Sequence, residues 1–183
     1  MYTPTTLTSL FTLIPLALAL PLEQRDTQVF NITLLSATVP EGGPYGSGPI
    51  DSHISVSLAY EDATGAAQST TCSYDWPASI APGPTDWTAC ADDTMTWRLP
   101  ADGWTSTADY LVEFYKQTTL EGAGLDASHY LTMNPGQTSD PNAYLSCLQM
   151  GKTAPLTCEL DGPLSAQTGP VVMSASEETA RAE

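Results

Sequence analysis

The sequence predicts an all-β protein, a single compact antiparallel β-barrel or sandwich held by two disulfides. Short runs rich in β-branched and aromatic residues recur along the chain and are separated by clusters of Pro, Gly and Asp. After the N-terminal apolar run, no stretch of ten or more residues carries the i, i+3, i+4, i+7 apolar stripe of an amphipathic helix. The chain has four cysteines, in two closely spaced pairs, which is typical of a disulfide framework in an exported protein.

The N-terminal segment, residues 1–19, is predicted to be a signal peptide. Leu10–Leu20 contains a single polar residue, and Ala17–Ala19 has the small-x-small pattern that signal peptidase requires. No Lys or Arg precedes the apolar run, so the positive n-region of such leaders is missing and a buried N-terminal helix is the alternative. Residues 20–26 are expected to be a short propeptide. We therefore predict a secreted, extracellular protein.

The folded domain is predicted to span residues 27–173, and its first strand is predicted at Val29–Ala37. This run is rich in β-branched residues and ends before a Pro/Gly cluster. Alternation places Phe30, Ile32 and Leu34 on one face of the strand and Asn31 on the other. Because Asn31 opens an Asn-Ile-Thr sequon, an outward orientation predicts N-glycosylation at this residue.

The clearest alternation in the chain lies in Ser52–Glu61, which is predicted to be a half-buried antiparallel strand. Small turn residues follow at Asp62–Ala66, so a hairpin with a returning strand at Gln68–Asp75 is expected. The apolar face of the first of these strands consists of Ile54, Val56, Leu58 and Tyr60.

The remaining strands are predicted at Asp86–Ala91, Thr94–Leu99, Asp109–Gln117, Tyr130–Met133, Ala143–Gln149, Leu156–Leu160 and Pro170–Met173. Thr119–Ser128 is expected to be a polar connection. Residues 174–183 have helix-forming composition without an apolar face, and we expect them to form a disordered tail.

The cysteines are expected to form two disulfides, each closing a loop that the chain-entropy model values at about 3 kcal/mol. Pairing Cys72 with Cys90 and Cys147 with Cys158 is favoured because each pair brackets two consecutive predicted strands, but the spacing leaves the two crossed pairings open. A zinc site is not expected, because the chain has no C-x-x-C motif and its two histidines, His53 and His129, stand alone. No cofactor is predicted.

The formal net charge is −16, from 21 acidic and five basic residues. A surface of this charge repels polyanions, so nucleic acid and anionic membranes are poor partners. Acidity is also an ordinary means of keeping an exported protein soluble, and it therefore says little about the function.

Four tryptophans fall within 29 residues, and exposed aromatic rings can hold sugars or flat phenolic compounds. Trp76 and Trp104 stand in predicted loops and are the better ligand-binding candidates, whereas Trp87 and Trp97 stand in predicted strands. The alternative for each of them, which is favoured, is that it packs on a disulfide or fills the core.

Paired carboxylates at Asp92 and Asp93, together with Asp86 and Glu113, are candidates for a glycoside hydrolase or a calcium site. Chance clustering is expected in a chain with 21 acids, so solvated side chains are the favoured interpretation. The chain has no G-x-S-x-G motif, and neither histidine stands in a triad context. We predict no catalytic residues and no enzyme.

The order of these features resembles the Alternaria major allergen-like family of small secreted fungal proteins. The matching features are the leader, the strand VFNITLLSA, the alternating strand ISVSLAY, Cys72, a Trp shortly before Cys90, the strands TMTWRL and YLVEFY, and the late pair Cys147 and Cys158. They cover nearly the whole mature chain, through spacing and pattern rather than one long motif. The resemblance implies a β-barrel with little helix and the sequential disulfides Cys72–Cys90 and Cys147–Cys158.

Members of this family are exported, some act on plants as elicitors or effectors, and the founding allergen carries small phenolic ligands. The resemblance therefore implies a protein that binds a host protein or a small phenolic ligand without catalysis. A carbohydrate-binding or cell-wall module is the alternative, and a secreted hydrolase is a further one. The founding allergen has an additional N-terminal cysteine associated with dimer formation. This chain has no fifth cysteine, so the resemblance does not extend to a covalent dimer and the oligomeric state is left open.

Overall fold

The computed structural model describes residues 28–40, 51–62, 64–77, 80–119, 123–151 and 154–178. The predicted signal peptide and propeptide, and the last five residues of the predicted tail, lie outside these ranges. Within them the regular structure is β-strand except for one 3-10 turn at Ala101–Gly103. No helix among the described residues is long and apolar enough to cross a membrane.

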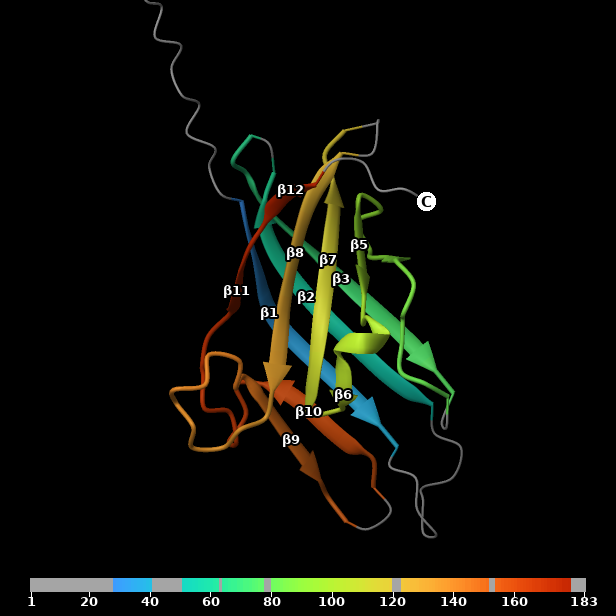
Figure 1. Ribbon diagram of the computed structural model, residues 1–183, viewed down its shortest axis with the longest axis vertical. Helices are drawn as coiled ribbons and strands as arrows, with labels where there is room; N and C mark the ends of the chain where they lie inside the picture. The colour runs from blue at the N-terminus through green and yellow to red at the C-terminus, as the bar shows by residue number, and fades with distance from the viewer. Residues whose placement is uncertain are drawn as a thin grey trace, which may run out of the picture.

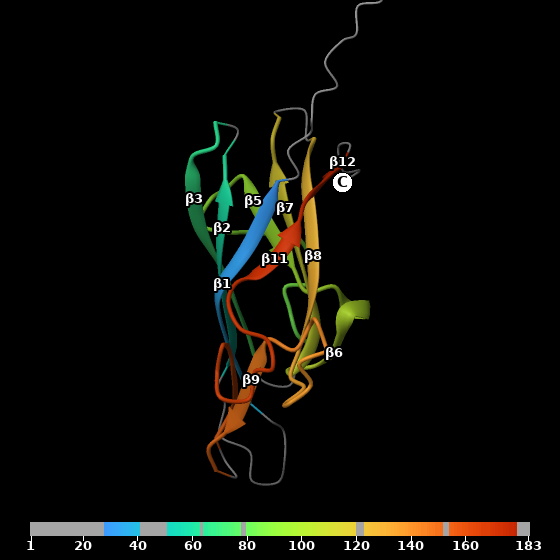
Figure 2. The same ribbon diagram turned by 90° about the vertical axis from the view of Figure 1, so that its left-hand side faces the viewer.

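Two antiparallel sheets form two layers (Figure 2). Sheet A has the order β3 (Ala67–Trp76), β2 (Ser52–Glu61), β1 (Val29–Val39), β10 (Leu156–Leu160) and β9 (Leu145–Gln149), and β11 (Val171–Ser174) also pairs with β1. Sheet B has the order β12 (Ser176–Glu178), β8 (Gly124–Thr132), β7 (Asp109–Gln117), β5 (Met95–Arg98) and β4 (Thr88–Ala89), and β6 (Trp104–Ser106) also pairs with β7. Figure 1 shows β7 and β8 crossing in front of β1, β2 and β3.

The inward faces of both sheets form one hydrophobic core. Alternation in β2 is as predicted, because Ile54, Val56 and Leu58 are fully buried and Tyr60 is nearly so. The largest fully buried side chains come from both sheets and include Trp97, Tyr110, Phe30, Phe114, Ile32, Met95, Leu131 and Met173. The all-β prediction is therefore confirmed.

A bulge in β1 changes which of its residues face the core. The pairing of β1 with β2 shifts between Ile32 and Leu34, so one extra residue enters β1 at this point. Leu34 is 67% exposed, whereas Leu35 is 4% exposed. The prediction that Leu34 shares a face with Phe30 and Ile32 is wrong, because the extra residue reverses the alternation beyond it.

Three strands have the predicted bounds, and others differ. The prediction of a polar connection over Thr119–Ser128 is wrong, since β8 already begins at Gly124. Its inward positions include Leu125 and Ala127, and the intervening small and polar residues hide the alternation. The tail prediction is wrong for residues 174–178, where Ala175 is buried and β12 pairs with β8. The strand predicted at Asp86–Ala91 shortens to β4.

Both disulfides join cysteines in sequential order, which excludes the crossed pairings. Cys72–Cys90 links β3 in sheet A to the residue that follows β4 in sheet B. Cys147–Cys158 joins directly opposite residues of β9 and β10 within sheet A. One bridge therefore connects the two sheets, and the other reinforces a single hairpin.

Candidate binding site

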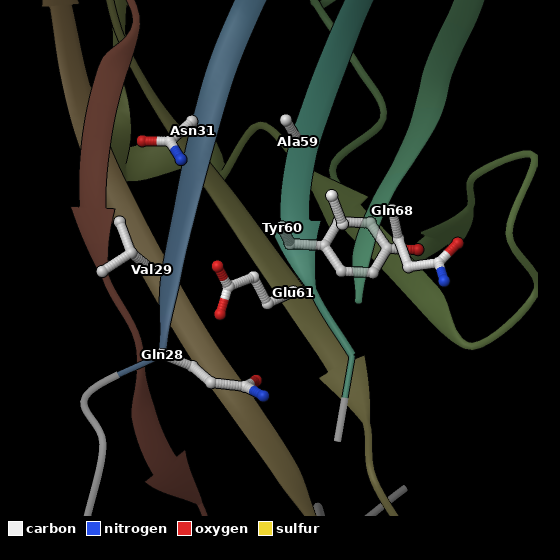
Figure 3. Close-up of a pocket in the computed structure, with 8 residues that line it drawn as sticks. Gln28, Val29, Asn31, Ala59, Tyr60, Glu61 and Gln68 are labelled. Carbon is white, nitrogen blue, oxygen red and sulfur yellow. The ribbon is translucent and has the colours of Figure 1, made fainter. Parts of the chain in front are cut away.

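A pocket of about 320 Å³ lies where β1 begins and the β2–β3 hairpin turns (Figure 3). Small side chains at Ala59 and Ala67 leave room beside β1, since Ala59 is the cross-strand partner of Asn31. Figure 3 shows Glu61 between β1 and β2, with Gln28 extending from the start of β1. The lining residues are Gln28, Val29, Asn31, Ala59, Tyr60, Glu61, Ala67 and Gln68.

Two of the residues that line the pocket, Gln28 and Glu61, carry side-chain hydrogen-bond acceptors. The Gln28 side-chain oxygen, Oε1, is buried and has no hydrogen-bond partner among the residues that the structure describes. Glu61 adds a carboxylate. Gln68 Nε2 donates to Asp62 Oδ2 over 2.9 Å, which fixes the Gln68 amide at the pocket rim. A buried acceptor without a partner is costly, so this pocket suits a ligand that brings hydrogen-bond donors.

Tyr60 forms part of the same wall, and its hydroxyl already has a partner. The Tyr60 hydroxyl donates a hydrogen bond to Asp92, which lies between β4 and β5. Burial, together with the neighbouring Asp92 carboxylate, raises the pKa of the Tyr60 phenol well above its ordinary value. Tyr60 therefore stays neutral and has a structural role beside the pocket.

The Asp92 carboxylate is held by several donors at once. Lys116 Nζ lies 3.2 Å from Asp92 Oδ2, and the Thr94 backbone N–H and hydroxyl both donate to Oδ1, over 2.9 and 2.7 Å. Burial opposes ionisation of Asp92, but the hydrogen bonds from Tyr60, Thr94 and Lys116 outweigh it and hold the pKa of this carboxyl well below its usual range. Such a group is a poor general acid near neutral pH.

The other acidic candidates do not converge on a free carboxylate pair. Glu113 Oε2 accepts from Arg98 Nε over 2.6 Å. Asp86 and Asp93 are exposed side chains. Among the residues that the structure describes, no three His, Cys, Asp or Glu side chains gather as a metal site requires. The structure therefore gives no geometric support to a hydrolase or a calcium site at these positions.

No family model, curated protein or solved structure matches this chain. The resemblance to the Alternaria major allergen-like family therefore stays a prediction.

The tryptophans do not form a common exposed platform. Trp76 ends β3 and is 4% exposed, so its predicted place in a loop is wrong, whereas the favoured interpretation of a core residue agrees with its burial. Trp104 opens β6, is half-buried and stacks on Tyr110 with ring centroids 5.0 Å apart. Trp97 is fully buried, as expected for a core residue. Trp87 is half-buried just before β4, with the Arg98 guanidinium 4.5 Å above its ring.

The histidines occupy different environments. His53 Nδ1 lies 2.6 Å from Asp75 Oδ1 on the outer face of sheet A. His129 is half-buried in β8 and packs edge-on against Tyr144, and its buried Nε2 has no hydrogen-bond partner within the described part of the chain. Burial outweighs a backbone hydrogen bond at Pro141 and lowers the pKa of His129. Neither histidine lines the pocket.

The sequence singled out only Asn31 among the residues that line the pocket. Prediction from the sequence missed Gln28, Glu61 and Gln68, because amides and a single carboxylate at strand ends match no recognisable binding motif. The small outward residues Ala59 and Ala67, on either side of a predicted turn, were the available sign of a hollow. Placing the hollow also required knowing that β1 pairs with β2, which the strand predictions did not specify.

Proposed function

We propose that this protein is a secreted binding protein that takes a small, neutral phenolic compound in the pocket beside β1, and that it is not an enzyme. The observation that carries the proposal is the buried, unpartnered Oε1 of Gln28 next to a cavity of about 320 Å³. A turn of the Gln28 amide into the pocket would bring this oxygen within reach of a ligand, and a phenolic O–H would then donate one strong hydrogen bond and satisfy the acceptor.

The rest of the pocket favours the same chemistry. Val29, Ala59 and Ala67 offer apolar surface for an aromatic ring, and Glu61 accepts from a second hydroxyl. Glu61 and the net charge of −16 disfavour an anionic ligand. A neutral aromatic ring with two adjacent hydroxyls therefore fits better than a carboxylate or a phosphate.

Two further observations support a secreted, non-catalytic protein. Two disulfides are typical of an oxidising compartment outside the cytosol. The half-buried acidic candidates each contact a basic side chain, Asp92 with Lys116 and Glu113 with Arg98, which supports a structural role for both.

A host protein is the second candidate partner, and one observation favours it. Leu148 and Met150 are exposed, at 43% and 88%, beside a second pocket of about 290 Å³ on β9 and β10. Exposed apolar groups at a sheet edge are typical of protein contact sites. The carbohydrate-binding alternative loses support, because Trp76 is buried and only Trp104 of its two candidates is partly accessible.

The test is a titration of the oxidised chain, residues 27–183, with 4-methylcatechol by isothermal calorimetry. Ala59→Phe should fill the pocket and weaken binding at least tenfold, and Gln28→Leu should weaken it several-fold by removing the acceptor. Ser55→Phe is the matched control, because Ser55 lies on the same face of β2 outside the pocket. Equal affinities for Ala59→Phe and Ser55→Phe would count against this pocket, and absence of any binding would count against the function.

A further inference from the structure

Asn31 belongs to two features at once. It is the first residue of the sequon Asn31-Ile32-Thr33, and its side chain lines the pocket (Figure 3). Phe30 and Ile32 on either side of it are fully buried, so Asn31 faces away from the core. Its amide makes no hydrogen bond within the described part of the chain, which leaves Nδ2 available for modification.

The surroundings of Asn31 leave room for a sugar in one direction. In register it lies between Ala59 of β2 and Val172 of β11. Val172 is 56% exposed, and its side chain is a larger obstacle beside Asn31 than Ala59, which contributes only a methyl group. A group attached to Asn31 Nδ2 therefore meets the least steric resistance above Ala59, which is the hollow that forms the pocket.

We propose that an N-linked glycan on Asn31 places its first sugar in the pocket, so that glycosylation and ligand binding exclude each other. The inference rests on the proposed function, because the ligand that the glycan excludes is the phenolic compound. Glycosylation then determines which molecules of this protein can carry ligand.

The covalent step is ordinary sequon chemistry with a lipid-diphosphate-linked oligosaccharide as co-reactant. A bond forms between Asn31 Nδ2 and C1 of the first N-acetylglucosamine, and the bond between C1 and the diphosphate oxygen breaks. The amide loses one proton, and the lipid diphosphate is the leaving group. Thr33 supplies the hydroxyl that the sequon requires, and it is exposed in the folded chain.

The pocket is chemically suited to the first sugar as well as to a phenol. Sugar hydroxyls are donors, and the pocket offers the acceptors of Gln28 and Glu61. A tethered group acts at an effective concentration on the order of millimolar or higher, so even weak contacts suffice to keep it in place. A free ligand must displace the tethered sugar, and this competition lowers the apparent affinity of the ligand.

The test compares two substitutions at one exposed position, in protein secreted by a yeast that glycosylates sequons. Thr33→Val removes the sequon but keeps Asn31 in the pocket, and the lost hydroxyl makes one hydrogen bond, to the Ser57 carbonyl over 3.2 Å. Thr33→Ser makes a change at the same place and keeps the sequon. The readouts are intact mass, hydroxyl-radical footprinting of residues 57–69, and affinity for 4-methylcatechol.

We expect the natural chain and Thr33→Ser to be glycosylated, to protect Ala59 and Glu61 from footprinting, and to bind the probe at least tenfold more weakly than Thr33→Val. Trimming the glycan to a single sugar with an endoglycosidase should leave the block in place. An unmodified Asn31, or a glycosylated chain with the footprint of Thr33→Val, would overturn the inference. Failure of Thr33→Val to bind 4-methylcatechol would instead refute the proposed function. The two outcomes are distinguishable, because the footprint shows where the glycan lies without any ligand present.

Discussion

The Tyr60 hydroxyl donates a hydrogen bond to the Asp92 carboxylate and so connects the two sheets near the pocket. Tyr60 belongs to β2 of sheet A, and Asp92 lies between β4 and β5 of sheet B. The Asp92 backbone N–H also donates to Thr70 Oγ1 on β3, over 2.8 Å. Lys116 of β7 completes the bridge, with Nζ 4.5 Å from the centre of the Tyr60 ring. An acid that resembled a catalytic candidate in the sequence thus stabilises the packing of the sheets.

Replacing Asp92 with Asn should lower the free energy of unfolding by about 1–3 kcal/mol, because a largely buried Lys116 loses its charged partner. Urea unfolding at pH 7 measures the change. Asp93→Asn is the matched control, since the neighbouring side chain is exposed and the substitution should change stability by less than about 0.5 kcal/mol. Equal effects of the two substitutions would show that the bridge contributes nothing.

The same carboxylate makes stability depend on acid pH. Its pKa is lowered in the folded chain, so the unfolded state binds more protons as the pH falls. The stabilisation is complete above the ordinary Asp pKa of about 4 and is lost as the pH falls from there through the folded-state pKa. Unfolding free energies measured from pH 6 to pH 2 should fall less steeply in Asp92→Asn than in the natural chain. Parallel curves would contradict this assignment.

The two disulfides should differ in their local effects more than in their global ones. The chain-entropy model gives each loop about 3 kcal/mol, so Cys72→Ala/Cys90→Ala and Cys147→Ala/Cys158→Ala should lose similar stability. Only the first pair anchors β4, a strand of two residues, to the other sheet. Amide exchange in Thr88–Arg98 should therefore rise when that pair is removed. A comparable rise in β9 and β10 for the second pair would refute the distinction.

His129 should make the fold less stable in mild acid. Its pKa is lowered by burial, so protonation favours the unfolded chain. Stability is complete above the ordinary His pKa of about 6.5 and falls as the pH drops below it, by up to about 1.4 kcal/mol per pH unit. Comparing urea unfolding at pH 7.5 and pH 5 should show this loss in the natural chain and in His53→Gln but not in His129→Gln. If His129→Gln lost as much stability between pH 7.5 and pH 5 as the natural chain, the pH dependence would come from another group.

The sequence predicted the parts of the fold in which local chemistry is decisive. Ser52–Glu61 alternates without interruption, and β2 has those bounds. β8 was largely missed because its stretch mixes glycine, alanine, serine and histidine, and its burial depends on packing against β7 and β12. Trp76 was misplaced because its Pro77 neighbour indicated a loop, whereas pairing with Ser52 extends β3 to include it.

The pocket was beyond sequence reasoning for a different physical reason. Its polar wall comes from residue 28 and from residues 61 and 68, which are far apart in the chain and meet only because β1 pairs with β2. Strand order is set by the global packing of both sheets, and no local pattern specifies it. Asn31 was identified as an outward residue, but its position at the pocket depends on the same pairing.

The bulge in β1 predicts that alanine substitutions at the neighbouring residues Leu34 and Leu35 have very different effects on stability. Leu35→Ala removes a side chain that is 4% exposed and should lower the free energy of unfolding by about 2–5 kcal/mol. Leu34→Ala removes one that is 67% exposed and should change it by less than about 0.5 kcal/mol. The two substitutions delete the same atoms one position apart, so each is the control for the other in urea unfolding. An unbulged strand would keep the simple alternation of Phe30 and Ile32 and give the reverse order, with the larger loss at Leu34.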